Sequence, residues 1–358
     1  MRFKRYKHYI YRYKGVAITD QYFEVEQSFF IWPRADRGYY WDEQARPGGL
    51  FAERTELTPM PPYLLETPET TEFYYTKVME KEPALFTKLA DTPLTKEGIL
   101  AFANAYGKLT RGEAVLTPRY SYPKGQKDEK PWKHGVLGLR EGEGGRTYGE
   151  VFGESLGFWR REIRDMRCTL KLWGWLVNQN MVALERVIHW SKDGHGVNYV
   201  LTDWEMLPEA KAADDIMDQL KATQTPFSAG LLASKDHHGE IFARFKPGDV
   251  LLPARYLVQS RINKKLQEHL VRPRLLMNER NQLEPYFYPE SLLAALWYQF
   301  FRVATGKNQL RRCSVCGLWA DVTEKRKNWS RHKECANRER VRRSRAKNSG
   351  HKLATRAP

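Results

Sequence analysis

Three of the four cysteines in this 358-residue chain lie near its C-terminal end, at a spacing typical of metal ligands. Two residues separate Cys313 from Cys316, fifteen follow, and two more separate His332 from Cys335. Two thiolates at this interval bind one Zn²⁺ from a tight turn, and a second pair completes a tetrahedral site. Because four protein ligands leave no open position, the sequence predicts one structural zinc ion rather than a catalytic one.

The residues around these four ligands favour a small module that folds around the metal. Gly317 suits the turn after Cys316. Trp319 and Trp329 are expected to pack beside the zinc, because so short a segment has too few apolar side chains to fold alone. Disulfide formation is the alternative, and the lack of a secretion signal disfavours it.

The positive charge of the chain is concentrated in the same region. Residues 307–358 contain 16 Lys and Arg against 4 Asp and Glu, so this segment holds +12 of the formal net charge of +16. Such a density attracts phosphate polyanions and makes their binding depend on salt. A solvated tail that keeps the protein soluble is the alternative. A metal-ordered scaffold beside the charges favours nucleic-acid binding instead.

An arginine-rich helix is predicted directly after Cys335. Its residue types favour a helix, and its cations would occupy nearly all faces rather than one. Such a helix can lie along or in a groove of a duplex, where arginine makes bidentate contacts to phosphate or guanine. The predicted nucleic-acid contacts are Arg338, Arg340, Arg342, Arg343, Arg345 and Lys347.

These motifs together resemble the CGNR-type zinc finger of bacterial transcription regulators. The matching text is Cys313-Ser-Val-Cys316-Gly-Leu-Trp, His332-Lys-Glu-Cys335 and Ala-Asn337-Arg338, with the basic helix after it. His332 stands where that pattern usually has Cys, and Ala336 replaces a Gly. The resemblance implies zinc and DNA binding, with a helical domain before the finger. The segment EPALFTKLADTPLTKEGILAFANAYGKL is similar to uncharacterised bacterial proteins that end in such a finger, which names no activity.

Length and composition predict a folded α+β chain of several parts, since 358 residues exceed the size at which one core keeps growing. Residues 1–75 are rich in aromatic and turn-forming residues, which favours short strands. Residues 76–306 are interpreted as a mainly helical domain of unknown role. The zinc finger and its basic helix occupy 307–348, and 349–358 are predicted to be a disordered tail.

Individual elements follow from hydrophobic spacing. Two short amphipathic helices are predicted between residues 76 and 110, with Thr95 near the start of the second. The polar, Gly-rich stretch 111–150 is predicted to be a long loop, followed by a long helix over 151–182 in which Cys168 is buried. Further predicted elements are helices at 206–222, 254–271 and 289–306, extended segments in 226–245 and a hairpin in 274–289.

Signals of catalysis are weak. His237 and His238 lie near an acid, and His195 follows Asp193 in a Gly-rich turn, but solvated histidines are ordinary in such polar loops. Acidic pairs, which are too common to indicate a nuclease, occur at Glu150 and Glu154 and at Asp214 and Asp215. Nucleophile-elbow, zincin and Walker motifs do not occur in the sequence. We therefore predict no enzymatic activity.

The sequence as a whole predicts a zinc-dependent DNA-binding protein, acting as a bacterial transcription regulator. It has no apolar run long enough to cross a membrane and no apolar signal segment, so a soluble cytoplasmic protein is expected. The large domain would sense a small-molecule ligand, form a homodimer or hold a partner. Two alternatives stay open: a finger for protein contacts or stability appended to an unrecognised enzyme, and binding of RNA instead of DNA.

Overall fold

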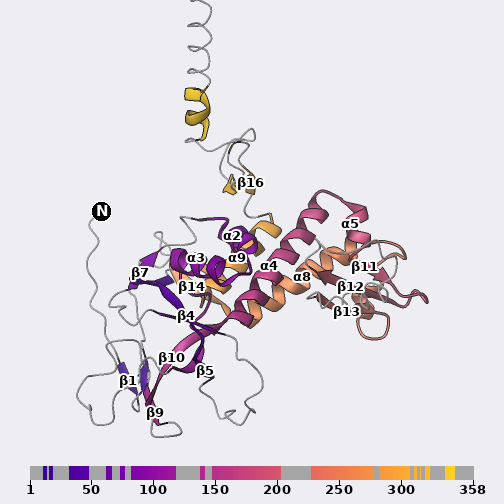
Figure 1. Cartoon of the computed structure of the whole chain (residues 1–358). Helices are drawn as coiled ribbons and strands as arrows, with labels where there is room; N and C mark the ends of the chain where they lie inside the picture. Colours follow the sequence, from indigo (N-terminus) through magenta and orange to yellow (C-terminus); the bar gives the residue numbers. More distant parts are fainter. Residues whose placement is uncertain are drawn as a thin grey trace, which may run out of the picture. The chain divides into compact units, whose positions relative to one another are not determined.

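The computed structural model shows a protein of mixed helix and sheet, as predicted for the fold class (Figure 1). It describes residues 11–13, 16–18, 32–47, 62–66, 73–76, 82–117, 138–141, 147–202, 227–277, 282–306, 310–312, 315, 319–322 and 335–342. The helix predicted at 206–222 and the predicted tail at 349–358 lie outside these residues. In the part of the chain that is described, no helix is both long enough and apolar enough to span a membrane.

The chain divides into two compact units. The first comprises residues 1–79, 89–168 and 264–295, and the second comprises 80–88, 169–263 and 296–358. Each unit is therefore assembled from three separate stretches of chain.

The described elements of the N-terminal region are all strands, in agreement with its aromatic and turn-rich sequence. They are β1 (Tyr11–Tyr13), β2 (Val16–Ile18), β3 (Trp32–Ala35), β4 (Tyr39–Asp42), β5 (Arg46–Pro47), β6 (Tyr63–Glu66) and β7 (Phe73–Thr76). β1 pairs with β2 and β3 with β7, both antiparallel. β4, β5 and β6 belong to a six-stranded sheet with later parts of the chain.

The long loop predicted at 111–150 is wrong, because this stretch contributes three strands to that sheet. They are β8 (Glu113–Thr117), β9 (Gly138–Glu141) and β10 (Thr147–Ser155), in the order β4-β6-β10-β8-β5 with β9 also on β10. Ala45, Tyr63, Leu65, Val115 and Val151 form its hydrophobic core. A Cβ at position 153 would stand 2.7 Å from Leu65 Cδ2, so a larger residue there would displace this core side chain.

The two short helices predicted before this sheet are α2 (Leu85–Asp91) and α3 (Lys96–Tyr106). The Thr95 side chain accepts a hydrogen bond from Gly98 N and caps α3, which confirms its predicted role at the helix start. Gly107 follows the last residue of α3 and has a φ of 99°, a backbone conformation that is unfavourable for residues with a side chain.

The long helix α4 (Leu156–Val177) starts five residues later than predicted, because β10 occupies residues up to Ser155. Trp159, Ile163 and Met166 are fully buried along it, and Cys168 is buried as predicted. Its residues up to Cys168 belong to the first unit and those from Thr169 to the second.

The second unit contains α5 (Met181–Glu185) and a three-stranded antiparallel sheet. The sheet is formed by β11 (Ile188–Trp190), β12 (Gly196–Thr202) and β13 (Phe227–Ser234), in that order. α7 (Gly239–Phe242) and α8 (Leu251–Glu268) follow. The extended segment predicted in 226–245 is therefore confirmed at β13, whereas its last part is helical.

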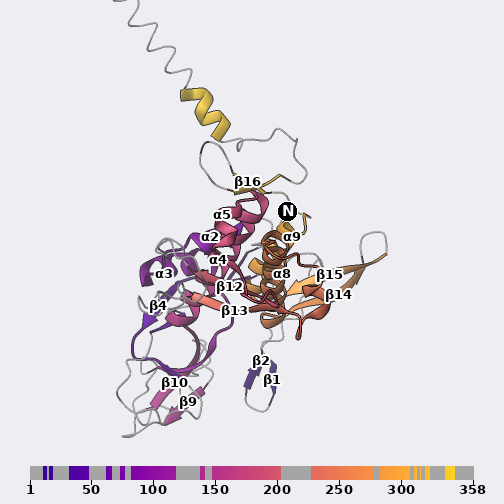
Figure 2. The same cartoon turned by 90° about the vertical axis from the view of Figure 1, so that its right-hand side faces the viewer.

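The predicted hairpin is β14 (Val271–Met277) paired with β15 (Leu283–Pro289) in the first unit (Figure 2). α9 (Leu292–Ala304) comes next, with Leu296, Trp297 and Phe300 fully buried. Ser291 Oγ accepts a hydrogen bond from Ala294 N at its start, and Gly306 has a φ of 74° just beyond its end.

Candidate zinc and nucleic-acid module

The first predicted cysteine pair lies between two paired strands. β16 (Leu310–Arg312) and β17 (Trp319–Asp321) are antiparallel, and Arg312 stands opposite Trp319. The chain from 313 to 318 therefore joins two strand ends held side by side. Cys313 follows β16 directly, and Cys316 is three residues before β17. Two thiolates at this spacing can share one metal ion.

The fourth predicted ligand, Cys335, is the first residue of a helical segment that covers residues 335–342. Its side chain is only 3% exposed, although the segment it begins is mostly exposed. Among the described residues of 307–358, the other buried side chain is Val322, directly after β17. Burial of the Cys335 thiol fits its predicted role as a zinc ligand.

The other three predicted ligands, Cys313, Cys316 and His332, lie outside the described residues, so the ligand set stays a prediction. Within the described residues, no group of three His, Cys, Asp or Glu side chains is arranged to hold a metal ion.

The helical segment 335–342 has a distinct inner and outer side, which the sequence alone did not predict. Cys335 is buried and Ala336 and Glu339 are half-buried, whereas Asn337 and the residues beyond Glu339 are exposed. The Glu339 carboxylate lies 3.1 Å from the Arg342 guanidinium. The exposed predicted contacts are Arg338, Arg340 and Arg342, while Arg343, Arg345 and Lys347 lie outside the described residues.

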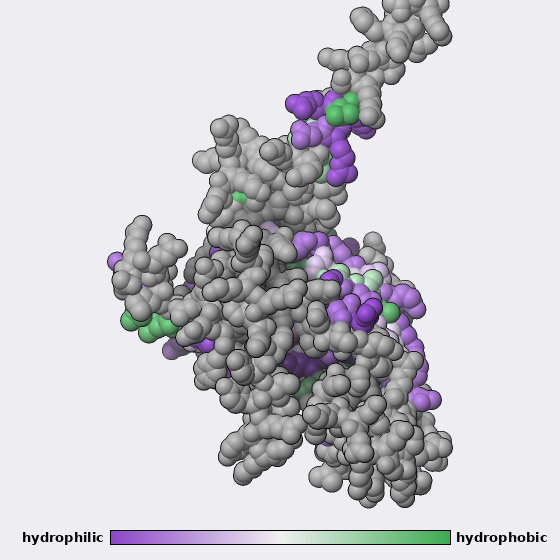
Figure 3. Space-filling view, turned by 90° about the vertical axis from the view of Figure 1, so that its left-hand side faces the viewer, coloured by the Kyte–Doolittle hydropathy of each residue, from purple (hydrophilic) through white to green (hydrophobic). Residues whose placement is uncertain are grey.

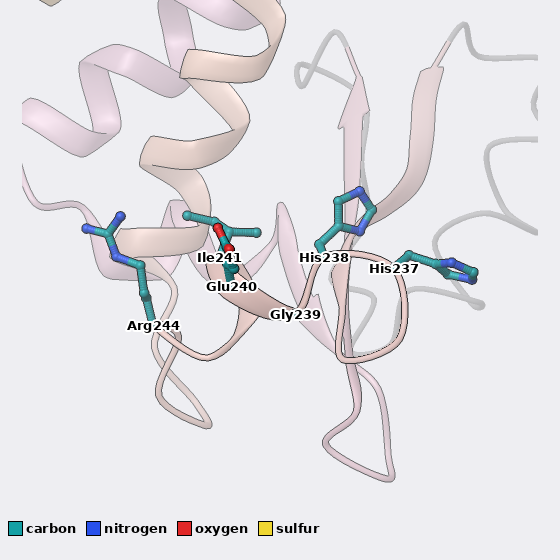
Figure 4. Close-up of a pocket in the computed structure, with 6 residues that line it drawn as sticks. All are labelled: His237, His238, Gly239, Glu240, Ile241 and Arg244. Atoms are coloured by element: carbon teal, nitrogen blue, oxygen red, sulfur yellow. The ribbon is translucent and has the colours of Figure 1, made fainter.

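The loop that contains His237 and His238 borders an open cleft. This cleft of about 440 Å³ is lined by His237, His238, Gly239, Glu240, Ile241 and Arg244 (Figure 4). The His237 ring points away from Glu240 and Arg244. In the neighbouring turn, Asp193 Oδ1 accepts hydrogen bonds from Ser191 Oγ and His195 N, which lower the pKa of that carboxyl. Asp193 therefore shapes the turn.

Of the acidic residues named in the sequence, Glu154 has a structural role within the first unit. Glu154 is 2% exposed, and its two carboxylate oxygens accept hydrogen bonds from Leu109 N, Thr110 N and Thr110 Oγ1 at 3.1, 2.6 and 2.7 Å. It therefore ties β10 to the loop before β8. Asp214 and Asp215 lie outside the described residues.

The structure also contains a buried ion cluster that sequence reasoning missed. Lys265 Nζ in α8 lies 2.7 Å from Glu162 Oε2 and 2.8 Å from Asp165 Oδ2, both in α4. His269 Nε2 lies 3.5 Å from the same Glu162 oxygen. Glu162 and Lys265 occupy positions in the apolar stripes of their helices, where charged residues are rare. A charged residue at an apolar position is therefore the sequence signal that could have indicated this cluster. Because Lys265 fills the space between the carboxylates, the cluster is an internal ion pair rather than a metal site.

Comparisons of the chain with protein-family models, with curated proteins and with solved structures found no match.

Proposed function

We propose that residues 307–348 form a zinc-stapled module that binds DNA, and that the protein is a cytoplasmic transcription regulator. The observation that carries the proposal is the contrast within the segment 335–342. A buried thiol begins this helix at the interval required of a fourth zinc ligand, while Arg338 and Arg340 are exposed on it. The paired strands around Cys313 and Cys316 support the same ligand set.

In this proposal Cys313, Cys316, His332 and Cys335 hold one structural zinc ion. The bound ion would stabilise the fold through its bonds to the four ligands, as a hydrophobic core stabilises a larger protein. It would also fix the start of the basic helix to the β16–β17 hairpin. The arginines would then meet the phosphates from an ordered helix, so that less conformational entropy is lost on binding. The net charge of +12 in residues 307–358 would supply the long-range attraction.

The test compares the full chain with two cysteine variants, by measuring zinc content and the binding of a duplex DNA across a salt series. We expect one zinc per chain and a slope of log K against log salt of roughly −4 to −5, for four to six neutralised phosphates. Cys335→Ala should lose both the zinc and the salt-sensitive binding. Cys168→Ala is the matched control, because Cys168 is also buried but lies far from this segment in the sequence, and it should keep both.

Three other outcomes would point elsewhere. Zinc without nucleic-acid binding would make the module a device for protein contacts or stability. Tighter binding to a competing RNA than to the duplex would move the function to RNA. A binding constant that does not change with salt would contradict the electrostatic contact itself.

A further inference from the structure

The exposure of the helical segment 335–342 follows the turn of the helix. At about 100° per residue, Cys335, Ala336 and Glu339 lie together on the inner side. Asn337 and Val341 are four residues apart, so they lie one above the other on the opposite side, and both are exposed. Val341 is 45% exposed. The middle of the outer face is therefore uncharged.

The arginines are arranged around this uncharged strip rather than within it. Arg338 and Arg340 are each one position from a member of the strip, and the turn of the helix places them on its two sides. Arg342 is further round, towards Glu339, and its guanidinium is 3.1 Å from that carboxylate. In Figure 3 this segment is mainly hydrophilic, with a small hydrophobic patch among its polar side chains.

This outer face matches the chemistry of a DNA major groove, which is wide enough for one helix. An asparagine side chain can bond an adenine through both N6 and N7, and a valine methyl can contact the thymine methyl. Flanking cations fit the two phosphate backbones that border the groove. A protein that needed only electrostatic attachment would gain nothing from an uncharged strip at the centre of its most basic helix.

We propose that Asn337 and Val341 read base edges in the major groove, and that Arg338 and Arg340 position the helix on the backbones to either side. The proposal rests on the DNA binding proposed above and adds sequence specificity for a site that contains A·T pairs. It also removes Arg342 from the reading face, because its charge is already paired with Glu339.

The first experiment selects sites from a pool of random duplexes with the zinc-loaded full chain, and then compares the selected duplex with a random one. Asn337→Ala should reduce the preference for the selected duplex about tenfold or more, since one bidentate base contact is worth 1–3 kcal/mol of discrimination. Its salt slope should not change, because no cation is removed. Arg338→Gln and Arg340→Gln should each weaken binding to both duplexes and reduce the slope by about one. Lys264→Gln, an exposed cation of α8 outside the module, is the control and should leave the affinity, the preference and the slope unchanged.

The second experiment replaces thymine by uracil in the selected duplex, which removes only the methyl group. The wild-type protein should bind the uracil duplex about fourfold more weakly, the value of one buried methyl. Val341→Ala should bind both duplexes equally. A pool without a preferred site, or an Asn337→Ala protein that keeps the wild-type preference, would overturn base reading while leaving salt-dependent DNA binding in place. Absence of any duplex binding would remove both proposals.

Discussion

At the scale of single residues, the first unit contains two charged side chains, Glu162 and Lys265, that are almost fully buried. Glu162 is 2% exposed in its side chain and Lys265 is 9% exposed, so each depends on the other for the stability of its charge. Burial alone would raise the pKa of Glu162, but the His269 and Lys265 side chains lower it to about 2. Burial alone would lower the pKa of Lys265, and Glu162 and Asp165 instead raise it. The pair is therefore ionised at neutral pH.

This lowered pKa predicts an acid-sensitive contribution to stability. The contribution of ionised Glu162 is complete above its ordinary pKa of 4.5, and it is lost as the pH falls from there towards about 2. Between pH 6 and pH 2.5, the free energy of unfolding of the wild type should fall by about 2–3 kcal/mol more than that of Glu162→Gln. Urea unfolding followed by circular dichroism measures this difference. Glu240→Gln is the control, because Glu240 is exposed and lies outside the ion cluster. Parallel pH profiles for wild type and Glu162→Gln would contradict the assignment.

Gly107 and Gly174 can be compared to test where the backbone requires glycine. An added Cβ at Gly107 would stand 2.8 Å from Pro33 O, and its φ of 99° is unfavourable for any side chain. Gly107→Ala should therefore lower the free energy of unfolding by about 1–3 kcal/mol. Gly174 lies inside α4 with no atom within 4 Å of an added Cβ, so Gly174→Ala should raise it by up to about 1 kcal/mol. Thermal and urea unfolding would show the opposite signs, and equal effects would be evidence against both arguments.

At the scale of elements, the β14–β15 hairpin exposes an apolar face. Alternation along the strands places Pro273 and Leu275 on one face of the hairpin, together with Leu283 and Phe287 of the partner strand. Leu275 and Leu283 are each 67% exposed, so these two residues contribute little to the core.

We therefore expect the hairpin to tolerate charge on this face. Leu275→Lys should change the free energy of unfolding by no more than about 0.5 kcal/mol, as for ordinary surface positions. Leu65→Ala is the contrasting variant, since Leu65 is 1% exposed in the sheet core, and it should cost about 2–5 kcal/mol. A large loss of stability from the lysine, measured by urea unfolding, would mean that the face is covered in solution.

The elements that could be predicted from the sequence are those specified by local signals. The cap residues Thr95 and Ser291 and the apolar stripe of α9 mark helices that the structure contains. β10 was missed because Gly149 and Gly153 dilute its alternation and its partners are remote, with Glu154 standing opposite Leu64. The partners of Glu162 depend on how two helices meet, which no local pattern specifies. Three of the four predicted metal ligands rest on spacing alone, because they lie outside the described residues.

At the scale of the whole molecule, each compact unit is assembled from stretches that are far apart in the sequence. The first unit needs residues 264–295, which supply Lys265 and the fully buried Leu292 and Leu293. Leu293 N also donates a hydrogen bond to Leu109 O within that unit. A cut after residue 168 would leave Glu162 without Lys265.

We therefore predict that a fragment of residues 1–168 does not fold, whereas a fragment of residues 1–306 does. The longer fragment keeps all three stretches of the first unit and lacks only the proposed zinc module. Circular dichroism and limited proteolysis should show a cooperative, protected 1–306 protein that no longer binds duplex DNA. A protected 1–168 fragment would show that the first unit is complete without its third stretch.

The interrupted first unit also has a consequence during protein synthesis. At 5–20 residues per second, the ribosome takes roughly 6–25 s to proceed from residue 168 to residue 295. Throughout that interval the apolar side chains of α4, such as Trp159 and Ile163, have been translated but lack the last stretch of their unit. We expect the nascent chain to be exposed to misfolding during this interval. Slower translation of the second unit would therefore lower the yield of the first.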